Sequence, residues 1–180
     1  MSLKITYFVH GTTTDNENDI ATGWLDGELS ELGIKQAKEL GALVKQKKFI
    51  AIISSDLQRA IDSAILTFGK KREIITDRRL REINYGKYNG KPDKFKNNLT
   101  DYINNPFPNG ESYKSVERRI KDFLEYWIKE YNNKRIAVVS HQASQLALEV
   151  ICNKKSWEKA IEEDWRKIGK WQPGWQYCFG

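Results

Sequence analysis

Short hydrophobic runs alternate along the chain with longer segments of helical periodicity. The runs at residues 4–9, 49–53, 74–76 and 135–139 are rich in β-branched and aromatic residues. Each is bounded by polar residues, which is typical of a buried strand. The pattern therefore predicts four strands, and the aromatic tail after residue 170 can add another strand at an edge.

The segments between these runs carry apolar residues three and four positions apart, which predicts helices. We expect helices at residues 30–48, 56–67, 112–131, 143–152 and 156–167. Ser30 and Asp56 are placed as N-caps, because their side-chain oxygens can accept from free N–H groups of the first turn. The expected core positions of the first helix are Leu32, Ile34, Ala37, Leu40 and Leu43 or Val44.

Strands that alternate with helices favour the α/β class. We expect a three-layer α/β/α sandwich with a mostly parallel central sheet, formed as a single domain over residues 1–180. Residues 83–111 differ from the rest of the chain in composition, because they are rich in glycine, proline and asparagine. They are predicted to form a small cap or lid.

Composition excludes several classes of protein. The 180 residues are 39% hydrophobic and 30% charged, which suits a packed core rather than wholesale disorder. No membrane partner is expected, since no apolar run approaches the roughly 20 residues of a membrane helix. The start lacks a signal-peptide pattern, and the two cysteines, Cys152 and Cys178, form no CxxC pair. A cytoplasmic location is therefore expected.

The chain carries a net charge of +6, spread along its length. This indicates a solvated basic surface or attraction for anionic substrates. Nucleic acid is not expected as a partner, because no nucleic-acid-binding motif accompanies the charge.

Both histidines lie at the ends of predicted strands, His10 after the first and His141 after the fourth. In open α/β sheets, ligands bind beyond the carboxyl ends of the strands. Both imidazoles are therefore expected at one ligand-binding edge. Two ordinary loop histidines, satisfied by backbone groups, are the alternative.

Other groups suited to phosphate follow the remaining strands. Arg59 lies in the first turn of a helix, where its guanidinium can fork onto a phosphate, and helix N-termini there add anion affinity. Gly11 leaves room for an anion beside His10. Glu82 can bring a carboxyl group to the rim, or can be a surface carboxylate among solvated neighbours. Imidazoles, cations and a carboxyl group together indicate phosphoryl transfer.

Six segments, in order, resemble the motifs of the histidine phosphatase superfamily, the phosphoglycerate-mutase-like enzymes. They cover nearly the whole chain. They are His10 and Gly11 with Thr13 and Asn16; residues 26–33 with Gln36 and Ala37; residues 54–60 with Ser63 and Ala64; residues 80–82 with Gly86 and Gly90; residues 108–112; and residues 138–141.

The resemblance implies a role for each matching residue. His10 would be the nucleophile that becomes phosphohistidine, and Glu82 the general acid and then the base for water. Arg59 and His141 would bind the phosphoryl group, assisted by Asn16, which could otherwise be a simple turn residue. No metal and no cofactor are implied. The remaining expected substrate contacts are Gly11, Thr13, Gln142, Tyr85 and Lys87.

The chain departs from the family pattern at the nucleophile. The arginine that precedes this histidine is missing, and Val9 stands there, by substitution or by loss of one residue. Thr12 replaces a glutamate and Gln142 a glycine. An active enzyme would need another cation, for which Lys87 or Lys91 of the cap is expected. A degenerate phosphate-ester-binding protein, or a sequence change in an ordinary phosphatase, are alternatives.

The small cap favours hydrolysis over intramolecular transfer, because it leaves a phosphohistidine open to water. We therefore expect a metal-independent phosphatase whose partner is a small phosphorylated substrate or inorganic phosphate. A phosphoglycerate mutase and a basic adaptor protein are the alternatives. Tryptophans near the C-terminus are expected in the core, and a homodimer through them stays open.

Overall fold

The computed structural model describes residues 1–180, and its main sheet has five strands in the order β4-β3-β6-β1-β7. Four of these strands are parallel to one another: β1 (Leu3–Val9), β3 (Ile52–Ser54), β4 (Ile75–Thr76) and β6 (Arg135–Ser140). Strand β7 (Trp175–Phe179) pairs antiparallel with β1 at the edge. The predicted mostly parallel sheet is confirmed, and the tail does add an edge strand.

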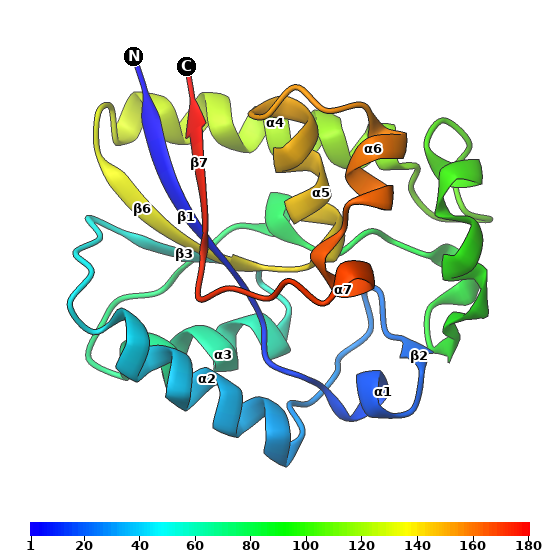
Figure 1. The fold of residues 1–180 in the computed structure, drawn as a ribbon, viewed down its shortest axis with the longest axis horizontal. Coiled ribbons are helices and arrows are strands. Elements are labelled where there is room, and N and C mark those ends of the chain that lie inside the picture. Colours follow the sequence, from blue (N-terminus) through cyan, green and yellow to red (C-terminus); the bar gives the residue numbers. More distant parts are fainter.

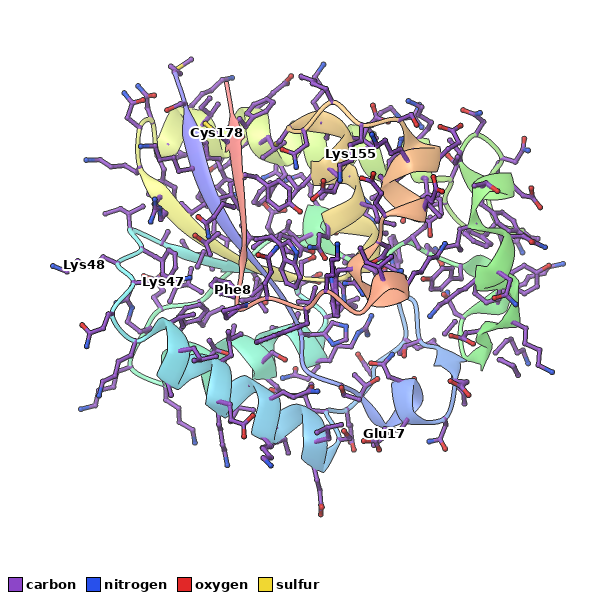
Figure 2. All side chains as sticks on the ribbon, viewed as in Figure 1. Phe8, Glu17, Lys47, Lys48, Lys155 and Cys178 are labelled. Carbon is purple, nitrogen blue, oxygen red and sulfur yellow. The ribbon has the colours of Figure 1, made fainter.

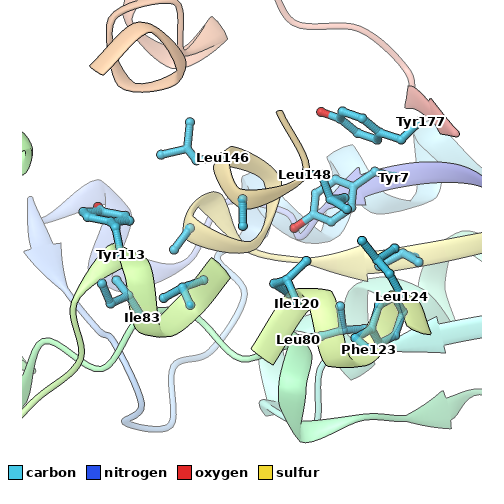
Figure 3. Packing of buried hydrophobic residues seen from close by; sticks show 14 of the residues in the cluster. Tyr7, Leu80, Ile83, Tyr113, Ile120, Phe123, Leu124, Leu146, Leu148 and Tyr177 are labelled. Atoms are coloured by element: carbon cyan, nitrogen blue, oxygen red, sulfur yellow. The ribbon is translucent and has the colours of Figure 1, made fainter. Parts of the chain in front are cut away.

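The alternation of side chains along β1 creates two cores. Ile5 and Tyr7 pack on one face, beneath helices α4 (Tyr113–Glu130) and α5 (Gln142–Ile151). Figure 3 shows this core, where Tyr7 lies near side chains of α4 and α5. Phe8 packs on the other face, beneath α2 (Glu31–Val44) and α3 (Gln58–Phe68). The result is the predicted three-layer sandwich (Figure 1).

Helix α2 begins after the predicted Ser30 cap, whose hydroxyl accepts from the Gly33 N–H. Of the expected core positions, Ala37 is buried, and so is Val44 of the Leu43 or Val44 alternative. Leu32 and Ile34 are wrong, because their side chains are exposed, and Gly33 joins the buried stripe in their place. Small residues let α2 approach its neighbours closely: a Cβ on Gly41 would lie 2.7 Å from the Thr67 carbonyl oxygen of α3.

Two predicted helix boundaries also need correction. Asp56 is not the cap of α3, because its carboxylate accepts both Nε and Nη2 of Arg81, at 2.8 and 2.7 Å. The predicted helix 156–167 is divided into α6 (Trp157–Glu162) and α7 (Trp165–Ile168). Asp164 is the N-cap at which the second of these helices, α7, begins, and its Oδ1 accepts from the Arg166 N–H.

The predicted cap, residues 83–111, consists of short elements: η2 (Gly86–Tyr88), β5 (Lys91–Pro92) and η3 (Asp93–Tyr102). Strand β5 pairs with β2 (Ile20–Ala21), which follows the short helix α1 (Thr14–Glu17). One more short helix, η1 (Arg78–Leu80), precedes the cap. The interior of the cap is aromatic and is formed by Tyr85, Tyr88, Phe95, Tyr102 and Phe107.

The basic residues are spread over the surface, as the sequence suggested. Lys48, for example, extends outward from the loop after α2 (Figure 2). None of the helices combines the length and apolar character needed to cross a membrane.

Candidate functional site

The two histidines lie together at the carboxyl edge of the sheet. Strands β1 and β6 are parallel neighbours in register, with Val9 opposite Ser140, so His10 and His141 leave the sheet side by side. Their ring centroids are 5.0 Å apart. The topology therefore produces the juxtaposition that the strand-end positions predicted.

His10 has a defined tautomer. Its Nδ1 lies 2.7 Å from the carbonyl oxygen of Gly11, so Nδ1 carries the proton and donates, while the Nε2 lone pair is free. Burial, together with the nearby Arg59 guanidinium, lowers the pKa of His10 to about 3. A neutral imidazole with a free Nε2 is the nucleophilic form.

His141 is completely buried, and the Tyr7 hydroxyl donates to its carbonyl oxygen at 2.6 Å. Its Nε2 lies 2.9 Å from the hydroxyl of Ser55, which follows β3. Nδ1 is buried without any hydrogen-bond partner. Burial and Arg59 hold the pKa of His141 well below its usual range. An unpartnered buried nitrogen is costly, and a phosphoryl oxygen could satisfy it.

Glu82 is buried beside the histidines, so its interpretation as a surface carboxylate is wrong. Its Oε1 accepts the N–H groups of Ile83 and Ala143, at 2.8 and 3.0 Å. The N-terminal Ala143 N–H of α5, expected to attract substrate, is therefore occupied by this carboxylate. Oε2 makes no hydrogen bond, which leaves it free for proton transfer.

The backbone of Glu82 is also fixed. Its carbonyl oxygen accepts from Trp24 Nε1 at 2.7 Å and from Arg119 Nη2 at 3.1 Å. Arg119 is in turn held by Glu111, at 3.0 and 3.2 Å from the two carboxylate oxygens. The turn at residues 108–112 thus positions the carboxyl group through Arg119.

A cavity of about 240 Å³ opens where these side chains meet. It holds both imidazoles and the Glu82 carboxylate, so the structure brings together three of the four predicted catalytic residues. The lining residues are Val9, His10, Thr12, Asn16, Glu82, Lys96, His141, Gln142, Trp165 and Arg166.

Arg59 lies beside this cavity rather than in its lining. The residue is only 2% exposed, and its Nη1 and Nη2 donate to the carbonyl oxygens of Leu25 and Gly23, at 3.1 and 2.7 Å. Two of its five N–H groups are therefore used by the loop after β2. Its charge still acts on both imidazoles, as their lowered pKa values indicate.

Gly11 and Thr13 are structural where substrate contact was expected. A Cβ on Gly11 would lie 2.4 Å from the Gly33 carbonyl oxygen, so the missing side chain admits the start of α2 rather than an anion. Thr13 is fully buried and caps α1 by accepting from the Asn16 N–H. The Asn16 side-chain oxygen accepts from the Thr13 N–H in turn, and Asn16 also lines the cavity.

The expected cap contacts are not in the cavity. Tyr85 is buried against Phe95 and Phe107, which removes it from the lining. Lys87 and Lys91 are exposed outside it. The cap cation that does line the cavity is Lys96, which lies on η3, 3.3 Å from Asp93.

A second cavity of about 580 Å³ adjoins His10 on the side of α2. Its outer lining is largely apolar, with Leu40, Leu43, Trp165 and Trp171. Glu39 is the one charged residue in this lining, which contains no lysine or arginine. The second cavity therefore does not suit a phosphate.

Sequence reasoning missed Arg166, which reaches the smaller cavity from α7. The one signal for it was indirect: the absence of arginine before His10 required a cation from elsewhere. With 30 lysines and arginines in the chain, that requirement could not select one.

Comparison with known proteins identifies the family. The family profile of the histidine phosphatase superfamily (branch 1) matches residues 7–167. Phosphoserine phosphatase 1 of Hydrogenobacter thermophilus is 34% identical over 136 residues, which cover 70% of this chain and 64% of that protein. The fructose-2,6-bisphosphatase TIGAR of Xenopus tropicalis is 35% identical over 136 residues, or 68% of this chain and 48% of that protein.

A solved structure supports the same family. The phosphoserine phosphatase of Entamoeba histolytica, in complex with 3-phosphoglyceric acid, superposes with a TM-score of 0.77 at 25% identity, covering 89% of this chain and 84% of that one. The matched region therefore spans less than two thirds of the two sequence relatives and most of the structural one. From its sequence profile, relatives and fold, the chain belongs to the histidine phosphatase superfamily.

Proposed function

We propose that this protein is a metal-independent phosphatase that hydrolyses small phosphomonoesters through a phosphohistidine at His10. The observation that carries the proposal is the shared cavity, in which a neutral His10 faces His141 and the free Oε2 of Glu82. The relatives named above, two of them phosphoserine phosphatases, support a phosphatase.

The first half of the reaction transfers the phosphoryl group. The Nε2 lone pair of His10 attacks phosphorus, and the bond from phosphorus to the ester oxygen breaks. The leaving oxygen takes the proton from Oε2 of Glu82, which becomes a carboxylate. The Nδ1–H of His10, already bound to the Gly11 carbonyl oxygen, stabilises the positive charge that forms on the ring.

The second half returns the enzyme to its starting state. The Glu82 carboxylate takes a proton from water, the resulting hydroxide oxygen attacks phosphorus, and the bond from phosphorus to Nε2 breaks. Arg59 and His141 stabilise the equatorial oxygens in both halves, His141 through its unpartnered Nδ1. A cavity of about 240 Å³ suits a phosphoryl group with a small leaving group.

A phosphate-ester-binding protein without turnover is the second candidate, and Val9 favours it, since an aliphatic side chain cannot stabilise a phosphoryl oxygen. Hydrolysis of para-nitrophenyl phosphate in the presence of a chelator distinguishes the two candidates. It is measured between about pH 5 and 8, a range that brackets the ordinary histidine pKa of about 6.5. We expect wild type to be active, and His10→Ala to lose at least about 1000-fold in kcat.

The exposed Lys48→Ala variant is the matched control and should keep full activity. Acid-quenched wild-type protein, analysed by peptide mass spectrometry, should carry phosphate on His10. An inactive wild type that still binds vanadate would replace the phosphatase with the binding protein. Activity retained by His10→Ala would exclude the proposed nucleophile.

A further inference from the structure

The cavity lacks a cation at the position that precedes the nucleophile. Val9 ends β1 and lines both cavities beside His10 with an aliphatic side chain. Phosphoryl transfer concentrates negative charge on the equatorial oxygens, and preorganised cations stabilise that charge. In the proposed mechanism, this part of the site must therefore receive its positive charge from another segment.

Arg166 enters the same cavity from the C-terminal side. It lies on α7, between α6 and the chain that leads to β7 (Figure 1), and it lines the cavity together with His10, Glu82 and His141. Its side chain is 26% exposed. Its charge reaches both imidazoles, since it contributes to the lowered pKa of His10 and of His141.

The guanidinium of Arg166 is held in place but not saturated. Nη1 donates to Asp164 Oδ1 at 2.9 Å and Nη2 to Gln145 Oε1 at 3.3 Å, while the group lies 4.5 Å from the Trp165 ring centroid. Its Nε makes no hydrogen bond, and each terminal nitrogen keeps a second N–H. Three N–H donors therefore remain for an anion.

A buried carboxylate fixes this arrangement. The Asp164 side chain is 1% exposed, and its other oxygen accepts from the side-chain amide of Gln142. Gln142 itself lines the cavity, directly after His141. Gln142 was one of the departures from the family pattern, and Val9 was another. The structure connects them, because Gln142 orients Asp164, and Asp164 orients the arginine that Val9 does not supply.

Lys96 is the other cation in the lining, and it is less suited to the role. It pairs with Asp93 at 3.3 Å on the same short element, with its ammonium 5.9 Å from the Tyr85 ring centroid. A lysine presents a single flexible point charge, whereas a planar guanidinium can bind two oxygens of one phosphoryl group. Only Arg166 is fixed by a buried acid.

We propose that Arg166, oriented by Asp164 and Gln142, binds the phosphoryl oxygens and replaces the arginine missing before His10. This inference rests on the proposed phosphatase function. It assigns part of the active site to the short helix α7, far from the other site residues in sequence.

The test is a rescue experiment on hydrolysis of para-nitrophenyl phosphate. Arg166→Ala should lower kcat/KM by about 100-fold, as loss of one preorganised donor does, and Arg166→Lys should recover part of it. Lys167→Ala is the matched control, an exposed cation on the same helix, and should stay within about twofold of wild type. Thermal unfolding checks that each variant is folded.

Restoring the missing arginine should then make Arg166 dispensable. Val9→Arg in the Arg166→Ala background should regain at least about tenfold in kcat/KM, because the charge returns from the other side of His10. Free guanidinium ion, titrated into Arg166→Ala at millimolar concentration, gives the same readout if the double variant does not fold. Vanadate affinity should fall and recover in parallel.

The outcomes separate this inference from the phosphatase proposal. If Arg166→Ala stays within about twofold of wild type while His10→Ala is inactive, the phosphatase stands and the role of Arg166 is overturned. A loss in Arg166→Ala that neither Val9→Arg nor guanidinium ion reverses also overturns it, because it shows a structural effect. If His10→Ala remains active, the phosphatase proposal itself fails.

Discussion

The cavity has two walls that are built differently. His10, Glu82 and His141 form the inner wall, and each is hydrogen-bonded to backbone or to a buried side chain at the ends of the sheet. Lys96 and Arg166 belong to the outer wall, on η3 and α7, and each is paired with an acid only two or three residues away in the chain. The inner wall carries neutral imidazoles, and the outer wall carries positive charge.

This difference separates two requirements of phosphoryl transfer. The reacting atoms need fixed geometry, which parallel strands in register provide, because a shift of β1 against β6 would break the whole ladder of pairs. The stabilising charge needs only to come within reach of the phosphoryl oxygens. It can therefore come from a surface segment, and a cation lost from the inner wall can be replaced from the outer wall.

After the loss of the nucleophile itself in His10→Ala, the largest expected effect concerns Glu82 of the inner wall. Glu82→Gln removes the proton donor while keeping the shape that accepts the Ile83 and Ala143 N–H groups. For an alkyl ester such as phosphoserine, kcat/KM should fall by about 100-fold, because a poor leaving group needs the proton. For para-nitrophenyl phosphate, a good leaving group, the loss should stay below about fivefold.

The exposed Glu125→Gln on α4 is the control and should change neither rate. Equal losses for both esters would mean that Glu82 binds or positions the substrate and is not the acid. The ratio of the two losses is therefore the measurement, since it is insensitive to the amount of folded enzyme.

The inner wall was predictable from the sequence because topology determines it. Four apolar runs predicted the parallel strands, and His10 and His141 were placed at one edge by that rule alone. The continuous apolar run at residues 4–9 also predicted that β1 is buried. Local chemistry was less reliable: Asp56 has the character of a helix cap, but Arg81 offers it a bidentate partner.

The outer wall could not be predicted, because no local pattern marks it. Arg166 lies two residues after Asp164, in a segment whose sequence predicts one continuous helix. The helix is broken at Asp164, whose buried carboxylate accepts from the Gln142 side chain. In the cap, Tyr85 was expected at the substrate and Lys96 was not considered. Which face of an irregular segment turns inward depends on packing of its aromatic residues, and spacing does not reveal this.

The next effect tests how rigid the inner wall is. Gly11→Ala places a Cβ 2.4 Å from the Gly33 carbonyl oxygen, which forces α2 away from the strand end. We expect a loss of about 1–3 kcal/mol in the free energy of unfolding, measured in urea, as for other overpacked sites. Activity should fall with it, because His10 binds the Gly11 carbonyl oxygen.

Gly27→Ala is the comparison, since its Cβ would meet side-chain atoms and no backbone, namely Thr22 Cγ2 at 2.9 Å and Asp15 Oδ2 at 3.7 Å. It should cost less than Gly11→Ala, because a side chain can shift where a helix backbone cannot. Equal losses would show that the start of α2 moves freely relative to β1, and the inner wall would then not be rigid.

The smallest effect concerns the response of the two buried histidines to acid. The pKa of His10 is lowered to about 3 and that of His141 well below its usual range, mainly by burial, so the folded protein binds fewer protons than the unfolded chain. Stability is therefore fully present above about pH 6.5, the ordinary histidine pKa, and is lost as the pH falls below it. At about pH 5 the loss for His10 should be of order 1–2 kcal/mol.

Urea unfolding of wild type and His10→Ala over this range measures the difference in slope. His10→Ala should lose stability more slowly on acidification, because one fewer neutral imidazole must be kept unprotonated. The same low pKa means that the acidic limb of kcat/KM should follow the second ionisation of the phosphate ester, near about pH 6, and not that of His10. Parallel slopes in the two proteins would show that His10 binds its proton in the folded state at the same pH as in the unfolded chain, near about pH 6.5. The lowered pKa of His10 would then be wrong, and below that pH His10 would be an imidazolium, which cannot be the nucleophile.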